Sequence, residues 1–150
     1  MGWPQRRRRS IPVVTAKLHH VVFCVHPEHQ EQAAAFWRDL GLTFQDIPLA
    51  EEGLHVLLDW SAGIEIVAPV EPAGTETARF RAFLAEHGEG VCSVVVRTAD
   101  VDEPIAIAAR HGAVVRYRQH REAGPMVLDE ADLVPVLGMP VTFLATNRPD

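Results

Sequence analysis

The chain has 150 residues, of which 47% are hydrophobic and 23% are charged, and its net charge is −6 at pH 7. This length and composition predict one soluble globular domain, and the sequence has no apolar run near the roughly 20 residues that a membrane-spanning helix needs. Two cysteines are too few for a disulfide framework and favour a cytoplasmic location, and the acidic body argues against a nucleic-acid surface.

The first module is predicted from the order of local patterns. Residues 1–16 read as a disordered basic tail with four consecutive arginines, and residues 17–150 as a single domain. A β-branched and aromatic run over 18–25 predicts a strand, and Pro27 then opens a helix that ends at Gly41. Strands at about 42–48, 54–60 and 63–69 follow, which gives the order βαβββ.

The same order returns after a connecting segment. Thr75 is the predicted N-cap of a linker helix over about 75–87, and Gly88 ends this helix. The second module is predicted as a strand at 91–98, a helix at 102–111 and strands at about 113–119, 126–130 and 140–146. Residues 130–138 are compatible with either a prolonged strand or a loop.

An internal repeat supports two modules, at about 17–70 and 90–147. Residues 18–25 align with 91–98, and residues 64–68 align with 141–145. A repeat of this kind indicates the duplication of one supersecondary unit. We therefore predict an α+β fold in which two tandem βαβββ modules form a cupped, barrel-like mixed sheet with the helices outside.

Two polar residues of the first module lose their counterparts in the second. His20 aligns with Ser93, and Glu65 aligns with Thr142. Side chains alternate along a strand, and the more apolar set of the first strand suits the face beneath a helix. His20 and Glu65 are therefore predicted to point into the cup. His19 and its counterpart Cys92 are predicted to lie beneath the helices as packing residues.

Four segments of the chain carry a resemblance to a known superfamily. Residues 17–25, 35–42 and 63–69 resemble the vicinal oxygen chelate superfamily, which includes glyoxalases, bleomycin resistance proteins and extradiol dioxygenases. Residues 83–91 are most similar to methylmalonyl-CoA epimerase-like members. The resemblance implies a homodimer and one divalent metal ion (Zn, Mn, Fe, Co or Ni) at the base of the cup.

By motif, the metal ligands implied by this resemblance are His20 and Glu65. Ser93 and Thr142 take the other two ligand positions, and neither hydroxyl is a good ligand for a divalent cation, so the second module is degenerate. The candidates for a further donor are His55, Asp129, Glu130, His120 and a symmetry mate across the dimer.

The resemblance implies a metal-assisted isomerase, epimerase or lyase that acts next to a carbonyl of a small oxygen-rich substrate. In this hypothesis His20 and Glu65 hold the metal, or Glu65 is the catalytic general base. The other interpretation is a hydrogen-bonded His20–Glu65 pair that is structural or only lines the pocket. The alternative is a metal-free protein that binds or sequesters an antibiotic-like small molecule, aromatic or cationic. The acidic charge of the chain and Trp60 near a strand end suit this alternative.

Four residues are predicted to line the pocket. Arg97 has the parity of Ser93, and its guanidinium would suit a carboxylate or phosphate, or it lies at the rim and reaches water. His55 is either functional or a satisfied core or rim histidine. The predicted pocket-lining set is His55, Ser93, Arg97 and Thr142.

Overall fold

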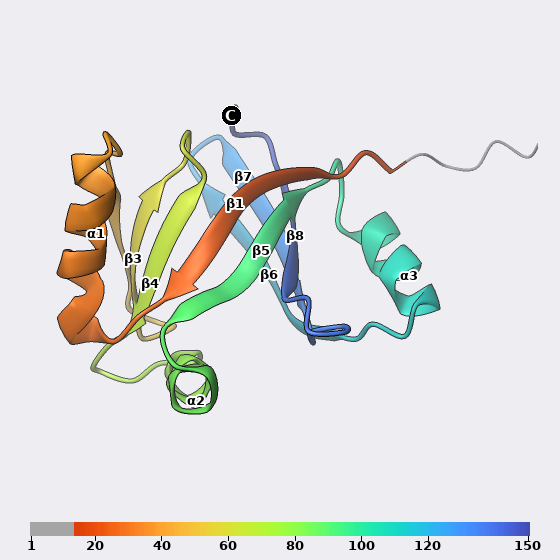
Figure 1. Cartoon of the computed structure of the whole chain (residues 1–150). Coiled ribbons are helices and arrows are strands. Elements are labelled where there is room, and N and C mark those ends of the chain that lie inside the picture. Colours follow the sequence, from red (N-terminus) through yellow and green to blue (C-terminus); the bar gives the residue numbers. More distant parts are fainter. Residues whose placement is uncertain (1–13) are drawn as a thin grey trace, which may run out of the picture.

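The computed structural model describes residues 14–150, which form one eight-stranded sheet and three α-helices (Figure 1). Residues 1–13 of the predicted basic tail lie outside the described residues. The elements are β1 (Lys17–Cys24), α1 (Gln30–Asp39), β2 (Gln45–Leu49), β3 (Leu54–Asp59), β4 (Ile64–Pro69), α2 (Thr77–His87), β5 (Gly90–Arg97), α3 (Asp102–Arg110), β6 (Val115–Ala123), β7 (Met126–Leu133) and β8 (Val141–Thr146).

The sheet consists of two βαβββ modules that meet at their first strands. The strand order is β2-β3-β4-β1-β5-β8-β7-β6. In each module the first strand pairs in parallel with the last, β1 with β4 and β5 with β8, and the modules join through the antiparallel pair β1–β5. The sheet curls into a half-barrel, so the predicted α+β fold with two modules is confirmed.

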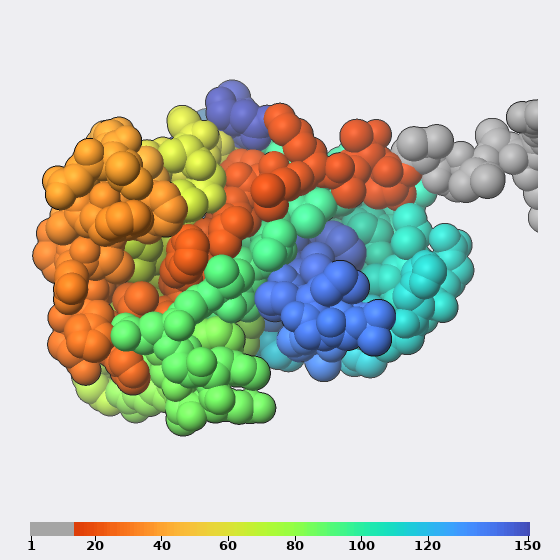
Figure 2. Space-filling model, in the orientation of Figure 1, coloured from red at the N-terminus to blue at the C-terminus, as the bar shows by residue number. Residues whose placement is uncertain are grey.

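α1 and α3 lie on the outer face of the curled sheet, whereas α2 packs Phe80 against the apolar cluster of the inner face. α1 packs on β4 over a cluster that includes Ala34, Ile66 and Ala68, all 0% exposed. In the view of Figure 2, β1 and β5 run across the molecular surface between the orange α1 and the cyan α3. A second apolar cluster lies around the inner face and includes Val22, Val56 and Val95. Within residues 14–150, no helix has the length and apolar character needed to cross a membrane.

Two local predictions change in the structure. β7 continues to Leu133, so residues 130–133 prolong the strand, and only the segment after it is a loop, with a bridge between Val136 and Met139. Thr75 is not the N-cap of the linker helix, because α2 begins at Thr77. The Thr77 hydroxyl instead accepts a hydrogen bond from the backbone N–H of Gly74 at 2.8 Å.

A β-bulge interrupts β1 beside the predicted site. Leu18 pairs with Val96 and His20 pairs with the adjacent Val95, so His19 is an extra residue on this strand. A bulge changes the direction of the side chains around it. The strict alternation used to place His19 beneath a helix therefore does not hold at this position.

Candidate functional site

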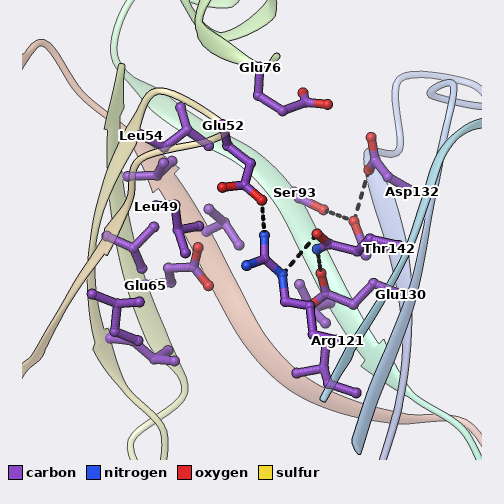
Figure 3. A pocket seen from close by; sticks show the side chains of 18 of the residues that line it. Leu49, Glu52, Leu54, Glu65, Glu76, Ser93, Arg121, Glu130, Asp132 and Thr142 are labelled. Atoms are coloured by element: carbon purple, nitrogen blue, oxygen red, sulfur yellow. Dashed lines mark hydrogen bonds and ion pairs between the residues drawn. The ribbon is translucent and has the colours of Figure 1, made fainter. Parts of the chain in front are cut away.

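The concave face of the sheet encloses one large cavity of about 550 Å³ (Figure 3). Strands of both modules contribute to its walls, and most of the wall is apolar. The aliphatic and aromatic side chains of the wall include Val22, Ile47, Leu49, Leu54, Val56, Leu58, Trp60, Val67, Phe80, Val95, Met126 and Leu128. A cavity of this size and character is typical of a site for a small organic molecule.

His20 and Glu65 meet in this cavity as a hydrogen-bonded pair. Nε2 of His20 lies 3.0 Å from Oε2 of Glu65, on the neighbouring strands β1 and β4. The His20 side chain is 4% exposed and that of Glu65 is 19% exposed. The parallel pairing of β1 and β4 brings together two residues that are 45 positions apart in the chain. The hydrogen bond with His20 offsets part of the cost of holding a carboxylate in an apolar cavity.

The bulge at His19 places a second imidazole against the first. Nδ1 of His19 lies 2.7 Å from Nδ1 of His20. The His19 ring also packs edge-on against Trp60, with 4.2 Å between centroids, and its Nε2 lies 3.5 Å from a carboxylate oxygen of Asp150. Burial and the neighbouring His20 lower the pKa of His19 to about 4, so its imidazole is neutral at neutral pH.

In the second module, hydroxyl groups stand where the resemblance implies ligands. Ser93 Oγ and Thr142 Oγ1 lie 2.7 Å apart, and Thr142 donates to Asp132 Oδ1 at 2.8 Å (Figure 3). The other oxygen of Asp132 accepts hydrogen bonds from Arg79 at 2.8 Å and Arg116 at 2.6 Å. The hydroxyls of Ser93 and Thr142 therefore already have hydrogen-bond partners within the protein. Their network continues through Asp132 to the guanidinium groups of Arg79 and Arg116.

Glu130 faces Glu65 from the opposite wall of the cavity, on β7 (Figure 3). It accepts a hydrogen bond from the side-chain amide of Gln119, which also accepts one from Arg121. Arg121 in turn forms an ion pair with Glu52, on the turn between β2 and β3, and so links the two modules across the cavity. Burial, and secondly the charge of Glu65, raise the pKa of Glu130 above its ordinary value.

Because the pKa of Glu130 is raised in the folded state, replacing it with glutamine should change how stability depends on pH. Below the ordinary glutamate pKa of 4.5, Glu130 is protonated in both the folded and unfolded states. As pH rises, the unfolded state loses this proton first, which lowers the free energy of unfolding of the wild type. We therefore expect Glu130→Gln to gain stability relative to the wild type between pH 4.5 and 7, measured by urea unfolding at a series of pH values. The exposed Glu28→Gln is the control, and parallel wild-type and Glu130→Gln curves would contradict the prediction.

Two of the predicted pocket-lining residues lie elsewhere. His55 alternates with Leu54 and Val56 on β3, so its side chain points to the helix-covered face, where it bonds to Gln30 at 2.6 Å and Asp46 at 2.7 Å. The prediction that it lines the pocket is wrong for this reason. Ser93 and Thr142 do line the cavity.

Arg97 also lies outside the cavity lining. It lies at the end of β5, and its guanidinium donates to the backbone carbonyls of Thr146 and Arg148 and to the Asp150 carboxylate, the last at 2.7 Å. The alternation of side chains along β5 does not reveal that the segment after β8 contacts this guanidinium.

The candidate further donors also separate in space. His120 and Asp129 bond to each other at 2.6 Å, and neither lines the cavity. Glu130 alone of the candidates on β6 and β7 lies in the cavity wall. Among residues 14–150, no group of three His, Cys, Asp or Glu side chains is arranged to hold a metal ion.

The residues present do not fit a single divalent ion. His20 and Glu65 are bonded to each other, and the hydroxyls of Ser93 and Thr142 are bonded within their own network. A catalytic metal site in a protein usually has three side-chain ligands, and neutral hydroxyls are poor substitutes for imidazole or carboxylate. Within the described part of the chain, residues 14–150, the metal coordination implied by the resemblance therefore lacks a suitable donor set.

Several cavity residues were not identified from the sequence as parts of a site. Asp132, Arg121 and Glu52 line the cavity and form its charged network. The alternation of β7 places Leu128, Glu130 and Asp132 on one face, and this signal was available in the sequence. The sequence alone does not show that the strand extends past residue 130, so it does not place Asp132 on this face. No sequence signal indicates that Glu52 and Arg121 meet, since they lie in different modules.

Comparisons with known proteins agree with this architecture. The profile of the glyoxalase-like domain matches residues 18–134. No curated protein sequence gives a match.

Solved structures of methylmalonyl-CoA epimerases share the fold. A variant of the Streptomyces coelicolor enzyme in complex with 2-nitronate-propionyl-CoA is 22% identical, with a TM-score of 0.67 over 91% of this chain and 100% of that chain. The Mycobacterium tuberculosis enzyme is 17% identical, with a TM-score of 0.59 over 86% of this chain and 87% of that chain. At this identity the likeness shows the fold alone. Because the profile covers most of its length, the chain belongs to the glyoxalase-like domain family of the vicinal oxygen chelate superfamily.

Proposed function

We propose that this protein is an isomerase, epimerase or lyase that removes a proton from a carbon next to a carbonyl group of a small substrate. Glu65 is the general base. The observation that carries the proposal is the position of its carboxylate, which is held by His20 and lies in an otherwise largely apolar cavity of about 550 Å³.

The surroundings of Glu65 suit this role. A carboxylate that is shielded from water by an apolar wall and by the bound substrate is a stronger base toward a carbon acid than one in bulk solvent. His20 donates to one oxygen of Glu65 and leaves the other oxygen without a partner among the hydrogen bonds of residues 14–150. This free oxygen is the atom that would accept the substrate proton.

The structural neighbours support the class of reaction. Several of them are described as methylmalonyl-CoA epimerases, and one of these is in complex with methylmalonyl-CoA and ammonium. Epimerisation of such a compound requires the removal and return of a proton next to a carbonyl. For this chain the acyl-CoA class is a starting point for choosing probes, and the cavity also suits smaller carbonyl compounds with an apolar body.

The test is proton exchange catalysed by protein stripped of metal. We expect the wild type to exchange the hydrogen next to the carbonyl with deuterium from D₂O in at least one member of a panel: methylmalonyl-CoA, 2-oxobutanoate and phenylpyruvate. Proton NMR gives the rate. Elemental analysis of protein purified without added metal should find less than one equivalent of Mn, Fe, Co, Ni or Zn, unchanged in His20→Ala. Exchange that requires a stoichiometric metal lost in His20→Ala would contradict the metal-free form of the proposal.

A second candidate function is metal-free binding of an aromatic or cationic compound. This function is favoured by Trp60, which lines the cavity. The Arg148 guanidinium carbon lies 4.3 Å from the centroid of the Trp60 ring, which is a cation–π contact. Acidic side chains also outnumber basic ones in the cavity lining. The test is to titrate the protein with a cationic aromatic dye. Tight binding of this dye, without proton exchange in any panel member, would favour this function over the first. The predicted homodimer and cytoplasmic location stay predictions.

A further inference from the structure

One guanidinium in the cavity wall has no carboxylate partner. The arginines that line the cavity are Arg79, Arg116, Arg121 and Arg148. Arg79 and Arg116 each form an ion pair with Asp132, and Arg121 forms one with Glu52. Among the hydrogen bonds and ion pairs of residues 14–150, none involves the Arg148 guanidinium, and residues 1–13 contain no Asp or Glu that could supply a partner.

The acidic side chains of the wall, in contrast, all have a partner within the protein. Glu76 pairs with Arg79, Glu65 is bonded to His20, and Glu130 accepts a hydrogen bond from Gln119. The others are Glu52 and Asp132, which pair with arginines, and Glu122, which pairs with His120. The acidic excess of the lining is therefore engaged in contacts within the protein, and the charge that still lacks a counter-charge is positive.

The position of the Arg148 guanidinium is fixed by the contacts around it. Its central carbon lies 4.3 Å from the centroid of the Trp60 ring. The backbone N–H of Arg148 donates to Oγ1 of Thr146 at 3.1 Å, and its carbonyl accepts a hydrogen bond from Arg97 at 2.8 Å. Nε1 of Trp60 donates to the carbonyl of Pro149, the next residue, at 2.8 Å. A side chain held in this way loses little further conformational entropy when it binds a ligand.

The carboxylate nearest to Arg148 in the sequence is bonded elsewhere. Asp150 accepts hydrogen bonds from Arg97 at 2.7 Å and from Lys17 at 3.4 Å. The half-buried Arg148 guanidinium thus lies unneutralised in a largely apolar wall, where an anion in the cavity would pair with it. Its planar set of N–H donors matches the two oxygens of a carboxylate, and its charge would repel a second cation on the Trp60 ring.

Trp60 connects this guanidinium to the proposed base. The Trp60 and His20 rings lie 6.5 Å apart between centroids, and His20 Nε2 lies 3.0 Å from Glu65 Oε2. An anion bound by Arg148 therefore lies at the same end of the cavity as Glu65. This suits an anionic group close to the reacting carbon better than one at the far end of a long substrate.

We propose that Arg148 binds a carboxylate group of the substrate and so orients the neighbouring carbon toward Glu65. The substrate class is then a carbonyl compound that also carries a carboxylate, such as a 2-oxo acid. This inference rests on the proposed function and narrows it. It gives Arg148 the role that the sequence suggested for Arg97, whose guanidinium is bonded to the segment after β8.

The test uses pairs of probes that differ in the carboxylate: phenylpyruvate with phenylacetone, 2-oxobutanoate with 2-butanone, and methylmalonyl-CoA with propionyl-CoA. By isothermal titration calorimetry, we expect the wild type to bind at least one acid about tenfold or more tightly than its neutral partner. Arg148→Gln should weaken binding of that acid about 10- to 100-fold, the contribution of hydrogen bonds between charged groups, and leave the neutral partner within about twofold. A wild type that prefers the acid in none of the pairs would overturn the proposal.

Arg110→Gln is the matched control, because it removes the same charge from an exposed position in the last turn of α3, outside the cavity lining. It should bind every probe like the wild type. An equal loss of acid and neutral binding in Arg148→Gln would indicate a structural role and count against the proposal. If Arg148→Gln does not fold, Arg148→Lys replaces it, since loss of the planar donor set should still weaken the acid more than its neutral partner.

A phosphate group is the other source of an anion that a guanidinium binds well. Inorganic phosphate is the probe for this source. If Arg148→Gln weakens the binding of inorganic phosphate and leaves that of every acid unchanged, Arg148 binds a phosphate group and the carboxylate proposal is overturned.

Proton exchange separates this inference from the proposed function. If the wild type binds an acid through Arg148 but exchanges no panel member, the proposed function fails and the carboxylate site stands. If the wild type exchanges a panel member and Arg148→Gln does so with unchanged KM and maximal rate, the carboxylate site is overturned and the proposed function stands. The result expected when both hold is a KM raised about 10-fold or more in Arg148→Gln.

Discussion

Replacing Glu65 with glutamine is expected to lower the rate of α-proton exchange by about 10²- to 10⁴-fold, the contribution of a positioned general base. The amide oxygen of glutamine can still accept the hydrogen bond from His20, and the side-chain volume is nearly unchanged. The loss should therefore appear in the maximal rate, while KM for the probe and the free energy of unfolding change little. The measurement is deuterium incorporation by NMR, together with urea unfolding.

Glu86→Gln is a suitable control because it removes an exposed carboxylate at the end of α2, outside the cavity. The comparison also separates the two candidate functions. A protein that only binds its ligand would show a changed dissociation constant in Glu65→Gln and no exchange in the wild type. Exchange by Glu65→Gln at the wild-type rate would remove Glu65 as the base.

Replacing Gly74 with alanine is expected to destabilise the protein by about 3 kcal/mol, the upper part of the usual cost of overpacking. An added Cβ would lie 2.2 Å from the carbonyl oxygen of Glu51 and 2.3 Å from the backbone nitrogen of Gly53. These are backbone atoms of the turn between β2 and β3, so they cannot move aside as a flexible side chain would. The measurement is the free energy of unfolding in urea.

Gly90→Ala is the matched control, since an added Cβ there meets no atom within 4 Å. It should stay within about 1 kcal/mol of the wild type. The Gly74 substitution should also disturb the cavity, because the same turn carries Glu52, which pairs with Arg121 across the cavity. Equal stabilities of the two variants would show that the turn can shift without cost.

The repeat in the sequence was sufficient for the architecture. The paired segments 18–25 with 91–98 and 64–68 with 141–145 became β1, β5, β4 and β8, the four central strands. This worked because hydrophobic alternation and turn residues are local properties, and a duplication makes each local signal appear twice. The convergence of His20 and Glu65 followed from the same alternation.

The alternation of side chains predicts the wrong position where a strand contains a bulge. It also fails where a side chain forms hydrogen bonds with residues distant in the sequence. The prediction that His19 lies beneath a helix fails because a β-bulge adds this residue to β1. The sequence around His19 contains no pattern that predicts the bulge. The His55 side chain forms hydrogen bonds with Gln30 of α1 and Asp46 of β2. The Arg97 side chain forms a hydrogen bond with Asp150, in the segment after β8. Each of these contacts joins residues whose proximity depends on how the elements pack.

The amino-acid sequence by itself determined the two-module α+β fold, the membership of the central strands and the alignment of His20 and Glu65 with Ser93 and Thr142 in the second module. Only the tertiary structure decided that the hydroxyls of Ser93 and Thr142 bond to each other and to Asp132, that Glu130 faces Glu65, and that the Arg148 guanidinium lies over Trp60 in the cavity wall. The physical reason is the distance along the chain over which each interaction acts. Periodicity and turn chemistry act over a few residues, whereas the partners of a buried polar group are set by segments that meet only when the sheet curls.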